Sequence, residues 1–156
     1  MFLFNWTLFF EILALVIFLL GLIAIGSVFV IRSLQASYKD LYKYQSKFDI
    51  ELRKIINLLS KGAGKNELED YNSRNIKKLP FEEKKILLSI IEEVMERIDE
   101  DNPDYEYIMR TYENLQENRR IRDTKAVQFN QRIYIFPFNV YAKILGYTPY
   151  DIYSKQ

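Results

Sequence analysis

The hydrophobic pattern of this chain begins with one uninterrupted apolar run, which starts at Ile12 and ends at Ile31. The run carries no charge, and Ser27 is its only polar side chain. At about 1.5 Å rise per residue, a helix of this length spans roughly 30 Å, which is the thickness of a bilayer's hydrocarbon core. The run therefore predicts a single-pass transmembrane helix that contacts the lipid bilayer from Ile12 to Ile31.

Two other structures compete with a retained anchor. A cleaved secretory signal needs a basic segment followed by an apolar core of about 7 to 15 residues. Residues 1–10 contain no Lys or Arg, and the apolar run is longer than such a core. A core helix of a soluble domain is the second alternative, but this run is apolar around its whole circumference. The pattern favours the retained anchor.

The charges next to the run predict its orientation. Arg32, Lys39, Lys43 and Lys47 follow the run, opposed only by Asp40, and no basic residue precedes it. Because Lys and Arg are enriched on the cytoplasmic side of membrane spans, we expect the N-terminus outside and the C-terminal domain in the cytoplasm. The predicted localisation is the cell membrane.

After the run the pattern changes to a heptad seam. Apolar residues recur at steps of four and three, with Gln45 in the one missing place. The seam comprises Leu34, Tyr38, Leu41, Phe48, Leu52, Ile55 and Leu59. No Gly or Pro separates it from the anchor, so we expect one continuous helix that ends near Gly62. The seam fits packing within one chain and equally a coiled coil between two copies, that is, a homo-oligomer.

A second helix is predicted to begin at Pro80 and to run to about Ile98. Proline is favoured in the first turn of a helix, and apolar residues follow it at helical spacing. Residues 65–79 lie between the seam and this helix. They are polar and are predicted to form a connector. Residues 99–104 form the next turn.

The third predicted helix begins at Pro103 and is ended or kinked by Pro137. Its apolar stripe comprises Ile108, Tyr112, Leu115, Ala126, Phe129, Ile133 and Phe136. Three striped helices joined by short connectors bury their apolar faces best against one another. The predicted fold is therefore all-α, with one N-terminal transmembrane helix followed by an antiparallel bundle of long helices. We divide the chain into the anchor (1–31), the bundle (32–137) and a short aromatic segment that packs on the bundle (138–156).

Composition narrows the chemistry that the chain can perform. The 156 residues include no Cys and no His, which removes thiolate nucleophiles, imidazole bases and the common zinc ligands. The 22 Lys and Arg nearly balance the 21 Asp and Glu, so no strong field attracts nucleic acid. We therefore expect no enzyme activity, no cofactor, no metal site and no nucleic-acid partner.

The chain has three charged clusters, and the acidic one leaves an alternative open. An acidic run could bind Mg²⁺ or Ca²⁺ through carboxylate oxygens, although it lacks EF-hand spacing and more simply forms a solvated helix end. The run consists of Glu92, Glu93, Glu96, Asp99, Glu100, Asp101, Asp104 and Glu106. Arg119 and Arg122 are expected to pair with carboxylates of another helix. A solvated face is predicted for Lys77, Lys78, Lys84 and Lys85.

Residues 129–147, FNQRIYIFPFNVYAKILGY, resemble the C-terminal motif of LemA-family bacterial membrane proteins. The matching positions are Phe129, Asn130, Ile133, Phe136, Pro137, Asn139, Ala142, Gly146 and Tyr147, with Phe129 in place of the usual Tyr. DIELRK, which contains Asp49, Leu52 and Arg53, is similar to a patch of the family's first helix after the membrane. The chain departs from the family pattern at Arg122 and Asp123, which stand where an earlier Tyr-Asn pair is usual. It departs again at Phe138, which replaces a common Gly.

The resemblance implies a membrane-anchored, all-helical bundle of long antiparallel helices without established enzymatic chemistry. The motif itself fits packing and termination, because Phe129, Ile133 and Phe136 would share one helical face that Pro137 ends. Asn130 and Asn139 could cap helices, bridge them or contact a ligand. Gly146 is expected to end a short helix that begins after Pro137.

These observations favour a membrane-anchored binding or scaffolding protein of the LemA type that acts through a protein partner. The alternative is an enzyme, or an enzyme-regulating subunit, that uses the acidic run with a divalent cation.

Overall fold

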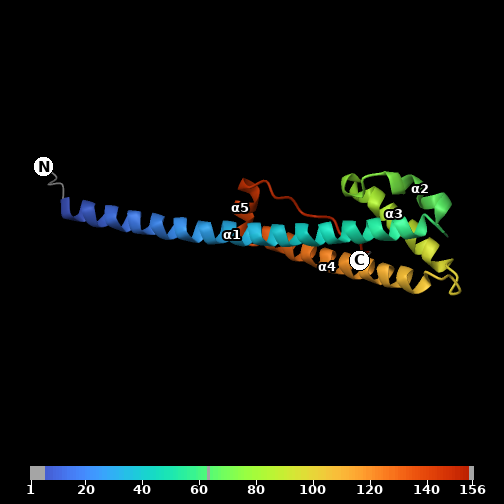
Figure 1. Cartoon of the computed structure of the whole chain (residues 1–156). Helices are drawn as coiled ribbons and strands as arrows, with labels where there is room; N and C mark the ends of the chain where they lie inside the picture. Colours follow the sequence, from blue (N-terminus) through green and yellow to red (C-terminus); the bar gives the residue numbers. More distant parts are fainter. Residues whose placement is uncertain (1–5, 63, 155–156) are drawn as a thin grey trace.

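The structure is a computed structural model that describes residues 6–62 and 64–154. In these residues it is helical and contains no strand, which confirms the predicted all-α class (Figure 1). The elements are α1 (Trp6–Leu59), α2 (Lys65–Ser73), the 3₁₀ helix η1 (Ile76–Lys78), α3 (Phe81–Glu96), α4 (Tyr105–Tyr134) and α5 (Phe138–Ile144). Residues 1–5 of the predicted outer segment and 155–156 of the aromatic segment lie outside the described residues.

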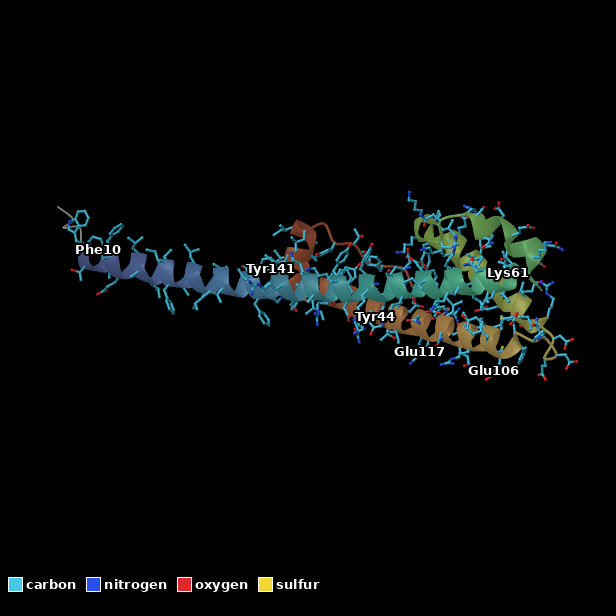
Figure 2. The ribbon with its side chains drawn as sticks, viewed as in Figure 1. Phe10, Tyr44, Lys61, Glu106, Glu117 and Tyr141 are labelled. Atoms are coloured by element: carbon cyan, nitrogen blue, oxygen red, sulfur yellow. The ribbon has the colours of Figure 1, made fainter. Side chains whose placement is uncertain are left out.

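Helix α1 unites the apolar run and the seam in one element. Its 54 residues correspond to a length of roughly 80 Å. Within residues 6–29 no side chain is buried, and Val30 is the first buried residue of the helix. Figure 2 shows mainly carbon atoms along this first part, whereas nitrogen and oxygen atoms gather around the rest of the molecule. By length and composition, α1 is the one helix among the described residues that could cross a membrane. Its exposure excludes a core helix of the chain.

Helix α4 lies along the second part of α1, and the two helices run in opposite directions (Figure 1). Lys125 Nζ lies 2.8 Å from Asp40 Oδ2, and Arg132 donates to the Ser33 hydroxyl nearer the membrane run. Further along, Arg122 Nε donates to Gln45 Oε1 at 2.8 Å. The full antiparallel bundle stays a prediction beyond this helix pair.

The apolar side chains of the helices form two clusters. The proximal cluster, near the membrane run, contains Val30, Leu34, Leu41, Ala126, Phe129, Ile133 and Ala142. The distal cluster joins α1 to α2, α3 and the start of α4 around Phe48, Leu52, Ile55, Leu87, Ile91 and Leu115. The buried seam positions of α1 are covered by elements of the same chain. A coiled coil with a second copy through this seam therefore has no support in the structure.

Several predicted boundaries shift by a few residues. α3 begins at Phe81, with Pro80 just before it, and α4 begins at Tyr105 rather than at Pro103. The connector contains α2 and η1, which bury Leu68 and Ile76.

The prediction for Phe136 is wrong. Helix α4 ends at Tyr134, before the chain reaches the turn at Pro137. A residue that precedes proline disfavours the helical region, so Phe136 does not continue the α4 stripe. Its side chain is 77% exposed, while Phe129 and Ile133 are buried in the proximal cluster.

Gly146 follows the short helix α5 and adopts a φ of +71°. The Gly146 amide donates to the Lys143 carbonyl, and the Tyr147 amide donates to the Ala142 carbonyl at 2.9 Å. This is the left-handed C-terminal turn for which glycine is preferred. As predicted, Gly146 ends the helix that begins after Pro137.

A Gly146→Ala variant should lose about 1–2 kcal/mol of unfolding free energy, the cost of a left-handed conformation for an L-residue. A Cβ atom at this position would meet no atom within 4 Å, so backbone strain is the only penalty. Gly62→Ala is the matched control, because a Cβ there also meets nothing and no positive φ is involved. Chemical denaturation of both variants in detergent tests this. Equal stabilities of the two variants would contradict it.

Candidate functional site at the C-terminal segment

Residues 147–154, hereafter the C-terminal segment, lead from α5 along the two long helices toward α3 (Figure 1). They carry no regular helix, so their backbone amides and carbonyls need partners from elsewhere in the chain. Side chains of α4 supply these partners, and polar residues of α1 and α3 extend the network. The candidate functional site is therefore the place where the C-terminal segment contacts α1, α3 and α4.

The deepest part of the site is an ion pair between α1 and α3. Lys84 Nζ lies 2.7 Å from Asp49 Oδ1, and both side chains are only 6% exposed. Gln45, one turn earlier on α1, donates from Nε2 to the same carboxylate oxygen at 3.1 Å. A buried charge needs a partner of opposite sign and hydrogen bonds, and Asp49 has both.

Arg122 connects this pair to the C-terminal segment. Its Nε donates to Gln45 Oε1, and its Nη1 donates to the Asp151 carbonyl at 2.5 Å. The guanidinium carbon lies 4.7 Å from the centroid of the Tyr153 ring, within cation–π range. A single buried Arg thus joins α1, α4 and the segment.

Asp123 and Asn130 hold the segment's backbone. The Asp123 carboxylate accepts hydrogen bonds from the amides of Tyr153 and Ser154, and from the Ser154 hydroxyl at 2.8 Å. Asn130 donates to the Tyr150 carbonyl and accepts from the Tyr150 amide, both at 2.8 Å. The two residues are seven apart on α4, so they lie on one face of the helix and fix the segment along it.

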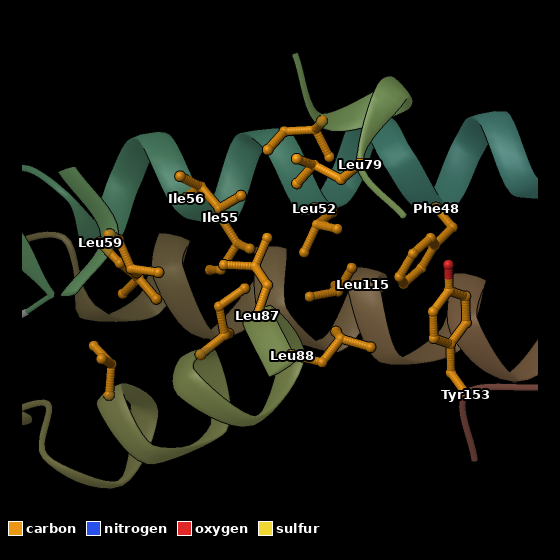
Figure 3. Packing of buried hydrophobic residues seen from close by; sticks show 14 of the residues in the cluster. Phe48, Leu52, Ile55, Ile56, Leu59, Leu79, Leu87, Leu88, Leu115 and Tyr153 are labelled. Atoms are coloured by element: carbon orange, nitrogen blue, oxygen red, sulfur yellow. The ribbon is translucent and has the colours of Figure 1, made fainter. Parts of the chain in front are cut away.

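Tyr153 anchors the segment in the distal cluster. Its ring stacks between Phe48, at 4.8 Å between centroids, and Phe81, at 4.5 Å. Figure 3 shows the Tyr153 ring facing Phe48 beside the apolar core of α1, α3 and α4. Nearer the membrane run, Tyr147 stacks on Tyr38 at 5.1 Å. In the structure Tyr147 and Tyr153 of the aromatic segment thus contact side chains of α1 and α3.

A cavity of about 370 Å³ lies beside this network. It is lined by residues of α1, η1 and the loop after it, α3, α4 and the segment: Tyr38, Tyr42, Gln45, Ser46, Asp49, Lys77, Leu79, Phe81, Lys84, Arg122, Pro149, Tyr150, Asp151 and Tyr153. Tyrosine rings offer flat apolar contact, and the hydroxyl, amide and charged groups offer hydrogen bonds. The cavity is therefore suited to binding a polar group with an apolar or aromatic part.

Burial changes the ionisation of two tyrosines of the segment. Burial raises the pKa of Tyr153 to about 12. Burial, and after it a hydrogen bond with Tyr38, raises the pKa of Tyr150 to about 12 as well. Both phenols hold their protons more tightly in the folded protein than in an unfolded chain, where the pKa is near 10.

The stability that these two phenols contribute should be complete below pH 10 and should be lost as the pH rises from 10 to 12. In that range the unfolded chain has released protons that the folded chain still binds, so deprotonation favours unfolding. Tyrosinate absorbance and circular dichroism, followed together against pH, measure this. In Tyr153→Phe, one fewer tyrosine should titrate at the high end. An unchanged high-pH titration in that variant would contradict the assignment.

The structure places the residues of the LemA-like motifs in two groups. Phe129, Ile133 and Ala142 pack in the proximal cluster, and Leu52 packs in the distal one. Asp49 and Asn130 belong to the polar site, the first at the cavity and the second through Tyr150, which also lines it.

The remaining motif residues have separate surroundings. Arg53 Nη1 donates to the Arg74 carbonyl at 2.5 Å, so this hydrogen bond links α1 to the connector just after α2. The Asn139 Oδ1 atom is buried without a hydrogen-bond partner in the described structure, and Pro137 lies at the start of α5. Of the roles left open for Asn130, the structure shows a bridge to the C-terminal segment.

The solvated face predicted for four lysines is wrong at Lys84. Lys77, Lys78 and Lys85 are exposed, but Lys84 lies on the buried side of α3 opposite Asp49. The apolar stripe contained one signal, because Lys84 lies three residues before Leu87 on the buried face of α3, but the stripe does not reveal a partner 35 residues away. The other available signals were Gln45 in a seam position and the charged pair Arg122–Asp123 on the stripe of α4.

The charged clusters form local ion pairs. Arg119 Nη1 lies 2.9 Å from Glu92 Oε1, which confirms the predicted pairing between helices. Arg122 instead pairs with its neighbour Asp123 at 2.9 Å. Within residues 6–62 and 64–154, no group of three or more acidic side chains could share a metal ion. The cation-dependent alternative gains no support from this geometry.

Comparison of the chain with models of protein families, with curated proteins and with solved structures finds no match in any of the three. The resemblance to the LemA family therefore stays a prediction that rests on the motif residues themselves.

Proposed function

We propose that this protein is a membrane-anchored helical binding or scaffolding protein of the LemA type. In this proposal α1 crosses the membrane once and presents an antiparallel bundle, with the cavity beside the C-terminal segment as its binding site. The carrying observation is that α1 is one uninterrupted helix whose first part is apolar and exposed and whose second part is packed. A continuous helix would hold the cavity at a set height above the bilayer.

The orientation in this proposal follows from charge. Arg32 comes directly after the apolar run, Lys39 follows about two helical turns later, and both are exposed, whereas no basic residue precedes the run. The positive-inside rule then puts the cavity in the cytoplasm. A cytoplasmic protein that offers a flat aromatic group and a charged group would fit this cavity.

Cysteine labelling tests the membrane part, because the chain has no native Cys. Thr7→Cys should react with a membrane-impermeant maleimide in intact cells, Ser89→Cys only after permeabilisation, and Leu20→Cys in neither case. Thr7 and Ser89 are both exposed, so cysteine is tolerated. Free reaction of Leu20→Cys would contradict a membrane span. Exchanged reactivities of Thr7→Cys and Ser89→Cys would contradict only the orientation.

Site-specific crosslinking tests the binding part. Tyr42 lines the cavity and is 66% exposed, so a photoreactive residue there reaches a bound partner without entering the core. The same residue at Lys61, at the far end of α1 in Figure 2, is the matched control. We expect a discrete adduct from position 42 and none from position 61. Equal crosslinking from both positions, or none from position 42, would contradict a binding role for the cavity.

A further inference from the structure

A second apolar surface lies at the corner between α4 and α5. It consists of Ile135, Phe136, Val140, Ile144 and Leu145, hereafter the apolar corner. Phe136 is 77% exposed and Ile144 is 74% exposed, and no other described element covers them. A group of large apolar side chains left uncovered on one corner is typical of a contact surface, because single exposed residues are common and clusters are not.

The corner lies beside the end of the apolar run of α1. The Tyr141 hydroxyl of α5 is hydrogen-bonded to the Ser27 hydroxyl, which belongs to that run. Ala142 packs in the proximal cluster together with Val30 and Leu34. Figure 2 shows Tyr141 of α5 next to α1, where the exposed part of that helix ends. The corner therefore stands at the level where α1 would leave the hydrocarbon core.

Basic residues surround the corner. Arg132 is exposed near the end of α4, and it donates to the Ser33 hydroxyl on α1 at 3.3 Å. Lys143 of α5 and Arg32 of α1, which directly follows the apolar run, are also exposed. Apolar side chains next to Lys and Arg are the pattern of elements that lie in a membrane interface, where the chains enter the acyl region and the cations meet phosphates.

We propose that the apolar corner inserts into the interface of the bilayer that α1 crosses and forms a second lipid contact. This inference rests on the proposed membrane span. The occupant is phospholipid for two reasons. The corner lies beside the last turns of the apolar run, where Tyr141 contacts Ser27, and Arg132 and Lys143 are exposed next to the corner in the chain, where they can meet headgroup phosphates. Two contacts, the span and the corner, then fix both the tilt and the rotation of the helix pair over the surface.

Lipid-attached quenchers test the inference on the full chain in vesicles of phosphatidylcholine and phosphatidylglycerol. An environment-sensitive fluorophore is attached to single cysteines at Ile144, Phe29, Leu20 or Lys61. Nitroxide lipids carry the quencher either near the headgroup or deep in the acyl chain. We expect Ile144→Cys to lose as much fluorescence to the shallow quencher as Phe29→Cys, and Leu20→Cys to respond most to the deep one. Lys61→Cys should respond to neither.

The outcomes separate this inference from the proposed function. If Ile144→Cys resembles Lys61→Cys while Phe29→Cys and Leu20→Cys are quenched, the span stands and the lipid contact is wrong. If Leu20→Cys is not quenched, both proposals fail. Fluorescence at Ile144→Cys that follows the protein-to-lipid ratio, with no lipid quenching, would show that a second copy covers the corner and would overturn the inference. Val140→Cys repeats the measurement on the same face, and circular dichroism confirms that each variant is folded.

Discussion

Replacing Lys84 with Met is expected to lower the free energy of unfolding by about 3–5 kcal/mol, the usual cost of removing one partner of a buried ion pair. The Asp49 carboxylate would lose a partner at 2.7 Å and remain in a site where it is only 6% exposed. Gln45 would still donate one hydrogen bond, but a neutral amide does not replace the ammonium charge. Denaturation in detergent, followed by circular dichroism, measures the loss.

The neighbour in sequence supplies the control. Lys85 is exposed on the same helix, so Lys85→Met should change stability by less than about 0.5 kcal/mol. The double variant Asp49→Leu, Lys84→Met removes both charges and should be more stable than Lys84→Met alone. A small loss in Lys84→Met, or a double variant as unstable as the sum of its two single variants, would show that the pair is not a buried ionic contact.

Replacing Asp123 with Ala is expected to release the C-terminal segment and to lower the free energy of unfolding by about 3–5 kcal/mol. The substitution deprives the Tyr153 and Ser154 amides of their acceptor and leaves the buried Arg122 guanidinium without its nearest carboxylate. Tyr153 would then keep its ring stacking and its cation–π contact with Arg122 but lose both hydrogen bonds from its backbone amide. Chymotrypsin cleavage after the tyrosines of the segment should become faster than in the unchanged chain.

Asp151→Ala is the matched control for this release. Asp151 contributes its backbone carbonyl to Arg122, and its side chain is exposed, so alanine preserves the contact. Its cleavage rate should equal that of the unchanged chain. If Asp123→Ala keeps the segment as resistant to chymotrypsin as Asp151→Ala does, the carboxylate does not hold the segment. Because Gln45 bridges Arg122 and Asp49, the effects of Asp123→Ala and Lys84→Met need not be additive.

The polar site explains how the motif residues relate to one another. Asn130 belongs to the LemA-like motif, and Asp123 stands where that family usually carries an earlier Tyr-Asn pair. In the structure both side chains bind the backbone of the C-terminal segment, seven residues apart on α4. Asp123 makes this contact with a charged group, which in turn pairs with Arg122.

Local patterns were sufficient for the existence of the long helices α1, α3 and α4, but not for α2 and η1 in the connector. The apolar run and the seam predicted α1, because hydrophobic periodicity and length are properties of neighbouring residues. Pro80 and Gly146 marked the start of one helix and the end of another, because their backbone preferences act within one turn. The seam also identified most of the buried positions of α1, from Leu34 to Leu59.

The tertiary structure alone decided which polar residues form the site. Lys84 stands three residues before Leu87 on the buried face of α3, but only the tertiary structure shows that Asp49 is the partner of its charge. Phe136 matches the stripe of α4, but the helix ends at Tyr134 and the chain turns the side chain outward. Hydrophobic periodicity and helix propensity predict which face of a helix is apolar, but they do not predict which charged groups come together. A charge pairs with whatever the packing brings within a few ångströms, and for Lys84, Arg122 and Asp123 those partners lie about 30 to 77 residues away along the chain.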